Sequence, residues 1–217
     1  MMKANKKKGL KIFSIIIGVI IISFLILLSV FNITYIKTKV NGASMYPTLN
    51  SDLGGGKDRI YINRFNKGTR GDIVVANIES EPNWDHTLEG KYIIKRLIAK
   101  GGDKVKIEKN DDEYTLFVNG EIFYQKQYSG GVPSFSAYEK YIEDNKIDSS
   151  RITEENEINI YEGEIFLMGD NWLSSYDSTT VGPLSKSSLV GRVDIVVPQS
   201  ENLIWGTIKG VAKTVFG

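Results

Sequence analysis

Leu116-Phe117-Val118-Asn119-Gly120-Glu121-Ile122-Phe123 is the stretch of sequence that decides the fold. Apolar and aromatic residues flank the central Asn-Gly pair on both sides. Asn-Gly is preferred in two-residue turns between antiparallel strands, because both turn positions need a positive φ. The stretch therefore predicts a β-hairpin.

Short segments of the same kind recur on both sides of this hairpin, rich in Ile, Val, Tyr and Phe and bounded by Gly, Asp or Asn. They are Asp58–Phe65, Asp72–Ile78, Lys91–Ala99, Asp103–Glu108, Tyr114–Phe123, Glu164–Met168 and Leu189–Val197. Such spacing predicts a mainly β fold, a folded antiparallel sheet or a barrel-like domain. Residues 125–160 break the pattern with Gly130-Gly131 and Pro133-Ser134, and are predicted to form an inserted polar cap or a flexible excursion.

One uncharged apolar segment precedes all of these strands. Ile12 to Phe31 contains twenty residues without a charge. At about 1.5 Å per residue it spans about 30 Å, the thickness of a bilayer core. A cleaved signal peptide would have a shorter apolar region and a small-residue cleavage site, which Ser29-Val30-Phe31-Asn32-Ile33-Thr34 does not provide. We predict a basic N-terminus at 1–11, a transmembrane anchor at 12–31 and a folded domain at 32–200.

The distribution of charge predicts the orientation of this anchor. The lysines that precede it are Lys3, Lys6, Lys7, Lys8 and Lys11, whereas only Lys37 and Lys39 follow closely. The positive-inside rule places the N-terminus in the cytoplasm and the remainder outside the cytoplasmic membrane. Of 27 basic residues, 20 remain after these seven, against 26 acidic ones, so the domain carries about −6. That charge argues against nucleic acid as a partner, and the lack of cysteine excludes disulfides and cysteine-ligated metals.

The tail at 201–217 has helical periodicity. Its apolar residues are Ile204, Ile208, Val211, Ala212 and Val215, with Lys209 and Lys213 between them. Two interpretations stay open: a helix at the membrane interface, in contact with lipid, and a helix packed on the domain's own surface.

Two stretches contain residues suited to nucleophilic catalysis, Gly42-Ala43-Ser44-Met45-Tyr46-Pro47-Thr48-Leu49 and Tyr92-Ile93-Ile94-Lys95-Arg96. A serine hydroxyl needs a base to take its proton. A lysine with a pKa of ~10.4 is only about 0.1% neutral near pH 7.5, but desolvation to a pKa of about 8 would leave roughly a quarter neutral. Strand alternation places Lys95 on one face with Ile93 and Leu97. This apolar face would desolvate the amine. Taken by spacing alone, a lysine that extends its amine to solvent is the commoner arrangement.

Histidine is the more usual base, and the chain has one, His86. It lies in a polar stretch between two predicted strands, where a surface-loop histidine is the expected role. A Ser-His-Asp triad built on His86 is the alternative.

The two stretches resemble the serine box and the lysine box of type I signal peptidases. Arg70-Gly71-Asp72-Ile73-Val74-Val75 and Met168-Gly169-Asp170-Asn171, the latter followed by Ser175 and Asp177, resemble two further boxes of that family. The four boxes stand in the family's order between Val40 and Val197. Lys95, where a histidine would be the other choice of base, resembles the bacterial form of the family rather than the endoplasmic-reticulum form.

The resemblance implies a role for each matching residue. Ser44 would attack the scissile carbonyl, Lys95 would take its proton, and Ser175 would hydrogen-bond the lysine. Asp177 would buttress the site, supported by Gly169, Asp170 and Asn171. Met45, Ile93 and Ile94 would wall shallow pockets that accept small residues at the −1 and −3 positions of the substrate. The resemblance implies neither a cofactor nor a metal.

Three positions depart from the family pattern. Many members have Arg where this chain has Trp172, and many have Arg two residues after the acid, where Thr179 stands here. Some members also place a hydroxyl two residues before the nucleophile, where Gly42 has no side chain, so the oxyanion hole would depend on backbone N–H groups.

The function implied is a membrane-anchored serine endopeptidase that removes signal peptides from secretory precursors. Two alternatives remain. One is a self-cleaving Ser/Lys protease similar to the SOS repressors, and the other is a specialised or inactive relative that acts in the assembly of surface appendages.

Overall fold

The structure is a computed structural model that describes residues 2–50, 57–81, 84, 91–111, 113–127, 151 and 157–216. His86 and most of the predicted insertion, 128–150 and 152–156, lie outside the described residues. The chain divides into two compact units, Met1–Ile36 and Lys37–Gly217.

The first unit is dominated by the helix α1, Met2–Thr34. Its stretch Gly9–Thr34 is long and apolar enough to cross a membrane, by length and composition, and its large apolar side chains are mostly exposed. The few polar side chains satisfy themselves within the helix: Ser14, Ser29 and Thr34 each donate a hydrogen bond to the carbonyl four residues earlier. A helix that satisfies its own polar groups is the structure that a single span in lipid requires.

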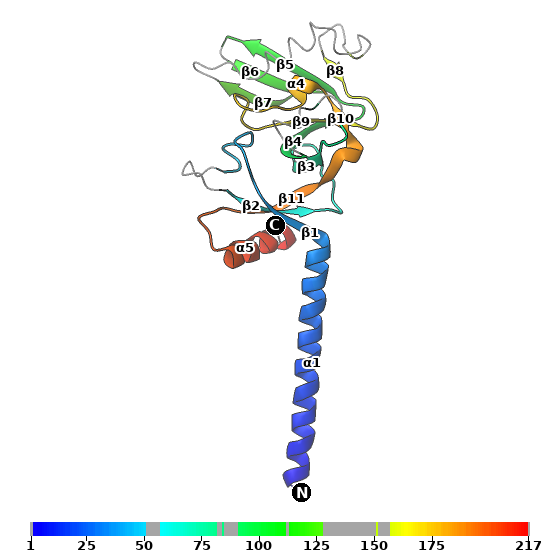
Figure 1. Ribbon diagram of the computed structural model, residues 1–217, viewed down its shortest axis with the longest axis vertical. Helices are drawn as coiled ribbons and strands as arrows, with labels where there is room; N and C mark the ends of the chain where they lie inside the picture. Colours follow the sequence, from blue (N-terminus) through cyan, green and yellow to red (C-terminus); the bar gives the residue numbers. More distant parts are fainter. Residues whose placement is uncertain are drawn as a thin grey trace. The chain divides into compact units, whose positions relative to one another are not determined.

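The second unit contains two antiparallel sheets (Figure 1). The strands are β1 Tyr35–Lys39, β2 Arg59–Asn63, β3 Ile73–Asn77, β4 Tyr92–Lys100, β5 Lys104–Asn110, β6 Glu113–Val118, β7 Glu121–Gln127, β8 Ile158–Asn159, β9 Glu164–Met168, β10 Leu184–Ser185 and β11 Leu189–Val197. The larger sheet has the order β1-β2-β11-β3-β4-β9-β10, and the smaller has the order β7-β6-β5-β8. The described part of this unit also contains three helical segments: α4 Ser178–Val181, η2 Lys186–Ser188 and α5 Leu203–Phe216. The mainly β prediction is therefore confirmed.

The predicted hairpin is confirmed as the pair β6 and β7, in which Val118 lies opposite Glu121. Asn119 and Gly120 form the turn, with φ of 55° and 78°. Positive φ at both positions is what a two-residue turn requires, and it explains the Asn-Gly pair.

Strands β4 and β9 are covered on both faces, which explains their nearly continuous apolar sequences. On one face Ile93 and Leu97 of β4 pack with Ile165 and Leu167 of β9 in one buried cluster. On the other face Phe166 and Met168 of β9 pack against side chains of the smaller sheet. An edge strand of the larger sheet needs only one apolar face, whereas β4 lies between two apolar cores. Strand β4 also carries Lys95, the candidate base.

Asp103 ties the turn after β4 to two other parts of the unit. Its carboxylate accepts hydrogen bonds from the backbone N–H of Lys100 at 2.9 Å, from Asn119 Nδ2 at 2.9 Å and from Arg70 at 2.6 Å. Burial alone would raise the pKa of Asp103, but these hydrogen bonds and the Arg70 charge outweigh it and lower the pKa below its ordinary value.

We expect Asp103→Asn to lower the free energy of unfolding at neutral pH. A depressed carboxylate pKa stabilises the folded state above the unfolded pKa of about 3.9, and this stabilisation is lost as the pH falls through the folded value. Thermal unfolding of the detergent-solubilised chain at several pH values checks this. The difference between parent and variant should shrink below about pH 4, and a difference that persists unchanged below that pH would contradict the role given to the Asp103 charge.

Candidate functional site

Ser44 lies in the loop that follows β1, and buried apolar side chains hold this loop in place. Met45 and Leu49 are buried, and a turn joins the Leu49 N–H to the Met45 carbonyl at 2.9 Å. Ser44 itself is half-buried, and Gly42 two residues earlier has a φ of 84°, a conformation that glycine adopts readily. The serine is therefore presented from a fixed loop.

A reciprocal pair of side chains closes the base of this loop. The Asn50 N–H donates to Asp58 Oδ2 at 2.8 Å, and the Asp58 N–H donates to Asn50 Oδ1 at 2.8 Å. Asn50 Nδ2 also donates to the carbonyls of Val40 and Gly42. Because these two carbonyls belong to the segment that leads from β1 to Ser44, the pair fixes the backbone just before this serine.

Lys95 is fully buried in the middle of β4, although it carries an amine. Ile93 and Leu97 precede and follow it at strand spacing, and Val74 of the neighbouring β3 lies opposite. All three belong to one buried apolar cluster. The alternation predicted for this strand thus puts the lysine stem on an apolar face.

The Lys95 amine is linked to a buried acid through a serine. Lys95 Nζ donates to Ser175 Oγ at 3.3 Å, and Ser175 Oγ donates to Asp177 Oδ2 at 2.5 Å. Asp177 is itself buried and also accepts hydrogen bonds from the Gly169 N–H at 2.8 Å and from the Thr179 hydroxyl at 2.7 Å. The serine hydrogen is therefore held by the acid, and the serine faces the lysine with its oxygen.

Thr179 supports Asp177 with two hydrogen bonds. Its hydroxyl and its backbone N–H both donate to Asp177 Oδ1, the latter at 3.0 Å, where Asp177 caps the short helix α4. Dipoles at a helix N-terminus stabilise a carboxylate. The acid is thus supported without a second charge.

Gly169 allows the two halves of the site to meet. A Cβ on Gly169 would overlap both Ser175 Oγ and the backbone carbonyl oxygen of Ser44. The same carbonyl accepts a hydrogen bond from the Asn171 N–H at 2.9 Å, and Asn171 Nδ2 donates to the Ala43 carbonyl at 3.1 Å. The loop after β9 therefore holds the serine backbone and Ser175 on either side of one glycine.

Asp170 joins the serine loop to the lysine strand through an ion pair. Arg96 donates to both carboxylate oxygens, at 2.8 and 2.5 Å, and the Thr48 hydroxyl donates to Oδ2 at 2.5 Å. The hydrogen bond from Asp170 is the largest cause that raises the pKa of Arg96 above its ordinary value. Arg96 also donates to the Gly71 carbonyl, so with Thr48 the pair connects all four boxes.

Trp172 has a structural place in this molecule. Its side chain is buried among residues of both sheets, including Ile98, Phe166 and Leu116. A large apolar side chain here packs the loop after β9 into the core. The position that departs from the family pattern is therefore a core position in this molecule.

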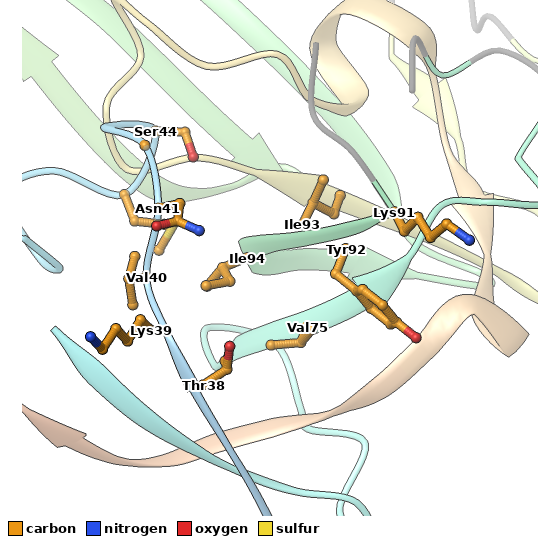
Figure 2. Close-up of a pocket in the computed structure, with 12 residues that line it drawn as sticks. Thr38, Lys39, Val40, Asn41, Ser44, Val75, Lys91, Tyr92, Ile93 and Ile94 are labelled. Carbon is orange, nitrogen blue, oxygen red and sulfur yellow. The ribbon is translucent and has the colours of Figure 1, made fainter. Parts of the chain in front are cut away.

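A groove runs from Ser44 along β4 (Figure 2). It has a volume of about 340 Å³. Its lining residues are Thr38, Lys39, Val40, Asn41, Gly42, Ser44, Met45, Val75, Lys91, Tyr92, Ile93 and Ile94. Figure 2 shows residues 38–41 on one side, β4 on the other and Ser44 at one end. The three predicted pocket residues, Met45, Ile93 and Ile94, are all among those that line it.

Several site residues escaped sequence reasoning. Thr48, Arg96, Asn50 and Asp58 had no predicted role, although they position the serine loop. Arg96 and Thr48 stood inside the quoted boxes, which was a usable signal, whereas the Asn50–Asp58 pair had none. Within the described ranges, no group of three or more His, Cys, Asp or Glu side chains could hold a metal ion.

Comparison with known proteins identifies the family of the chain. Residues 10–198 match the family model described as signal peptidase, peptidase S26. The chain is 29% identical over 195 residues to signal peptidase I U of Bacillus subtilis (strain 168), covering 88% of this chain and 90% of that protein. It is 30% identical over 182 residues to signal peptidase I T of the same organism, covering 82% and 81%.

A solved structure is also similar to it, the crystal structure of a signal peptidase I from Enterococcus faecalis V583. The sequence identity is 25%, the TM-score is 0.34, and the match covers 58% of this chain and 96% of that one. Because the family model spans most of the sequence, including all four boxes, the chain belongs to the signal peptidase family, peptidase S26.

Proposed function

We propose that this protein is a membrane-anchored serine endopeptidase that removes signal peptides from secreted precursors, with Ser44 as nucleophile and Lys95 as general base. The observation that carries the proposal is the complete burial of Lys95 on an apolar strand face, with its amine joined to Ser175 and Asp177. Burial disfavours the charged ammonium relative to the neutral amine. A neutral amine is what a base for Ser44 requires.

Ser175 would orient the lysine amine for this reaction. A serine hydroxyl has one hydrogen, and here that hydrogen points to Asp177. Ser175 can then only accept from Lys95, so a neutral amine that donates one N–H to Ser175 keeps its lone pair for another partner. In the proposed reaction that partner is the Ser44 hydroxyl, as the serine attacks the scissile carbonyl.

The proposed steps then conserve protons throughout. Lys95 takes the Ser44 proton, and the tetrahedral intermediate forms with its oxyanion facing backbone N–H groups, since Gly42 offers no side chain. The Lys95 ammonium returns the proton to the leaving amine as the peptide bond breaks. Water then attacks the Ser44 ester with Lys95 again as base, which releases the signal peptide and restores the enzyme.

The groove supports an extended substrate with small side chains near the scissile bond. Its walls are two extended segments, which suits a peptide in strand conformation. Met45, Ile93 and Ile94 line it together with Ser44. We propose that they limit the residues at −1 and −3 to small ones, and that secretory precursors are the substrates. The anchor would hold the N-terminus in the cytoplasm and the domain outside, as the lysine distribution predicts.

Incubation of the detergent-solubilised chain with a secretory precursor, followed by N-terminal sequencing of the product, tests this function. We expect one cleavage after a small residue, and no cleavage when a bulky residue replaces the one at −1. A precursor left intact under all conditions would favour the inactive assembly relative, and cleavage of the chain itself alone would favour the self-cleaving protease. Protease added outside intact spheroplasts should digest the domain, and protection until lysis would contradict the orientation.

A further inference from the structure

Strand β4 has a neighbouring strand on both edges along only part of its length. Strand β3 pairs with β4 from Tyr92 to Arg96, whereas β9 pairs with β4 only from Arg96 onward. Among the described strands, none lies beside residues 92–94 on the edge that faces away from β3. The same three residues line the groove that leads to Ser44. The groove therefore follows an open edge of β4.

Backbone groups of two residues on this edge point into the groove. The Lys91 carbonyl accepts a hydrogen bond at 2.8 Å and the Leu97 N–H donates one at 2.9 Å, both with residues that flank β3. Successive residues of a strand alternate between its two edges, so the odd-numbered residues of β4 bond toward β3. Tyr92 and Ile94 then direct their N–H and carbonyl groups to the groove, where an extended peptide can pair with them.

The loop after β9 closes one end of this open edge. Strand β9 ends at Met168, opposite Arg96, and residues 169–174 continue from there. The loop is fastened to the nucleophile segment, because the Asn171 N–H donates to the Ser44 carbonyl at 2.9 Å. A peptide whose −1 and −3 residues occupy the groove has its scissile bond at Ser44, at one end of the groove (Figure 2). The residues that follow the scissile bond therefore pass the loop after β9.

This loop exposes a large apolar side chain, Leu173. The Ser174 N–H donates to the Asn171 carbonyl at 3.0 Å, so residues 171–174 form a turn with Trp172 and Leu173 at its two central positions. Trp172 is buried and anchors the turn in the core, whereas Leu173 is 48% exposed. The turn thus holds an apolar side chain at the surface beside the nucleophile.

Alternation along an extended peptide selects the substrate residue that reaches Leu173. Side chains two positions apart point to the same side, and the scissile bond joins −1 to +1, so −3, −1 and +2 share one side. The +2 residue lies about 7 Å beyond −1, within reach of a turn that is fastened to Ser44 itself.

We propose that Leu173 is a specificity-determining residue that contacts the substrate side chain at +2, and that the protein prefers precursors with an apolar residue there. This inference rests on the proposed function. It extends recognition from the signal peptide to the first residues of the mature chain, which the Ile93 and Ile94 side of the groove does not reach.

Cleavage of peptides that differ only at +2 tests this preference. Each peptide spans a signal-peptide cleavage site with Ala at −3 and −1, carries Leu or Asp at +2, and is incubated with the detergent-solubilised full chain. We expect kcat/KM to be about 10-fold higher for the Leu peptide, because apolar contacts of this size discriminate to that extent. Leu173→Ser should abolish the difference and Leu173→Met should keep it. Leu173→Lys should reverse the preference, because the lysine attracts the aspartate.

A matched control separates this contact from general damage to the unit. Ile122→Ser removes an exposed apolar side chain (62%) from β7 of the smaller sheet and should keep the parent preference. Thermal unfolding of Leu173→Ser should change little, because the Leu173 side chain is half exposed. Equal cleavage of the two peptides by the parent, or an unchanged preference in Leu173→Ser and Leu173→Lys, overturns the inference, while the cleavage itself still supports the function.

A photo-crosslink tests the same contact without cleavage. The probe is the same peptide with benzoylphenylalanine at +2, bound to the Ser44→Ala variant so that it stays intact, and mass spectrometry locates the attachment. We expect attachment within residues 169–174, and attachment to any other segment overturns the inference. If the parent chain cleaves neither peptide, the proposed function fails, and the site of attachment still decides whether a bound peptide lies against Leu173.

Discussion

Lys95→Ala, Lys95→Arg and Lys95→His are all expected to lower kcat/KM for precursor cleavage by about 10³-fold or more, because a general base contributes about 10²–10⁴-fold and serves both halves of the reaction. Arginine cannot give up its proton, and histidine is shorter and of a different shape. Ser44→Ala should fall to the same level. Ser175→Ala should lose less, since Ser175 orients the amine and does not react.

Circular dichroism and thermal unfolding of each variant check that the loss is chemical. Lys95→Ala removes a buried side chain and costs stability, so activities are compared at a temperature at which every variant is folded. His86→Ala is the matched control for the histidine alternative and should keep nearly full activity. An inactive His86→Ala variant beside an active Lys95→Ala variant would restore the histidine triad.

Gly169→Ala is expected to lower kcat/KM by about 10²-fold, because displacements of about 1 Å at an active site can cost that much. A methyl group here would overlap both Ser175 Oγ and the Ser44 carbonyl. The backbone of the nucleophile Ser44 would therefore move away from Ser175, which orients Lys95. The effect should fall on kcat more than on KM, since the groove along β4 is untouched. Steady-state kinetics of precursor cleavage measures both constants.

Gly120→Ala provides the matched control for Gly169. Gly120 has a φ of 78°, so alanine there is strained, but a Cβ would meet nothing within 4 Å, and the residue lies in the hairpin turn between β6 and β7. The variant should lose stability by about 1 kcal/mol and keep its activity. Equal losses of activity in the two glycine variants would show that stability, not site geometry, explains Gly169→Ala.

Local chemistry accounts for the parts of the fold that could be predicted from sequence. The Asn119-Gly120 pair predicted a hairpin because few residues accept positive φ at two successive positions, and the pair β6 and β7 follows. Strand alternation placed Ile93 and Leu97 on one face, and both lie in one cluster with Lys95 between them in β4. These inferences needed only neighbours along the chain.

Long-range pairing accounts for what could not be predicted. Nothing in the segments themselves indicates that β11 inserts between β2 and β3, or that the strands divide into two sheets. Thr48 and Asp170 meet across 122 residues of sequence. The burial of Trp172 likewise depends on packing against the smaller sheet. From the sequence, Trp172 was recognised only as a departure from the family pattern. Alternation fixes a side chain's face, but partner choice depends on the whole fold.

The most direct test of the Ser44–Lys95 dyad compares the two single variants, Ser44→Ala and Lys95→Ala, with the variant that combines them. All are measured as full chains on one precursor, with product formation followed to long times. If the two residues act as one unit, the double variant should be no slower than either single variant. A double variant slowed by the product of the two single effects would mean that the residues act independently, and would contradict the dyad.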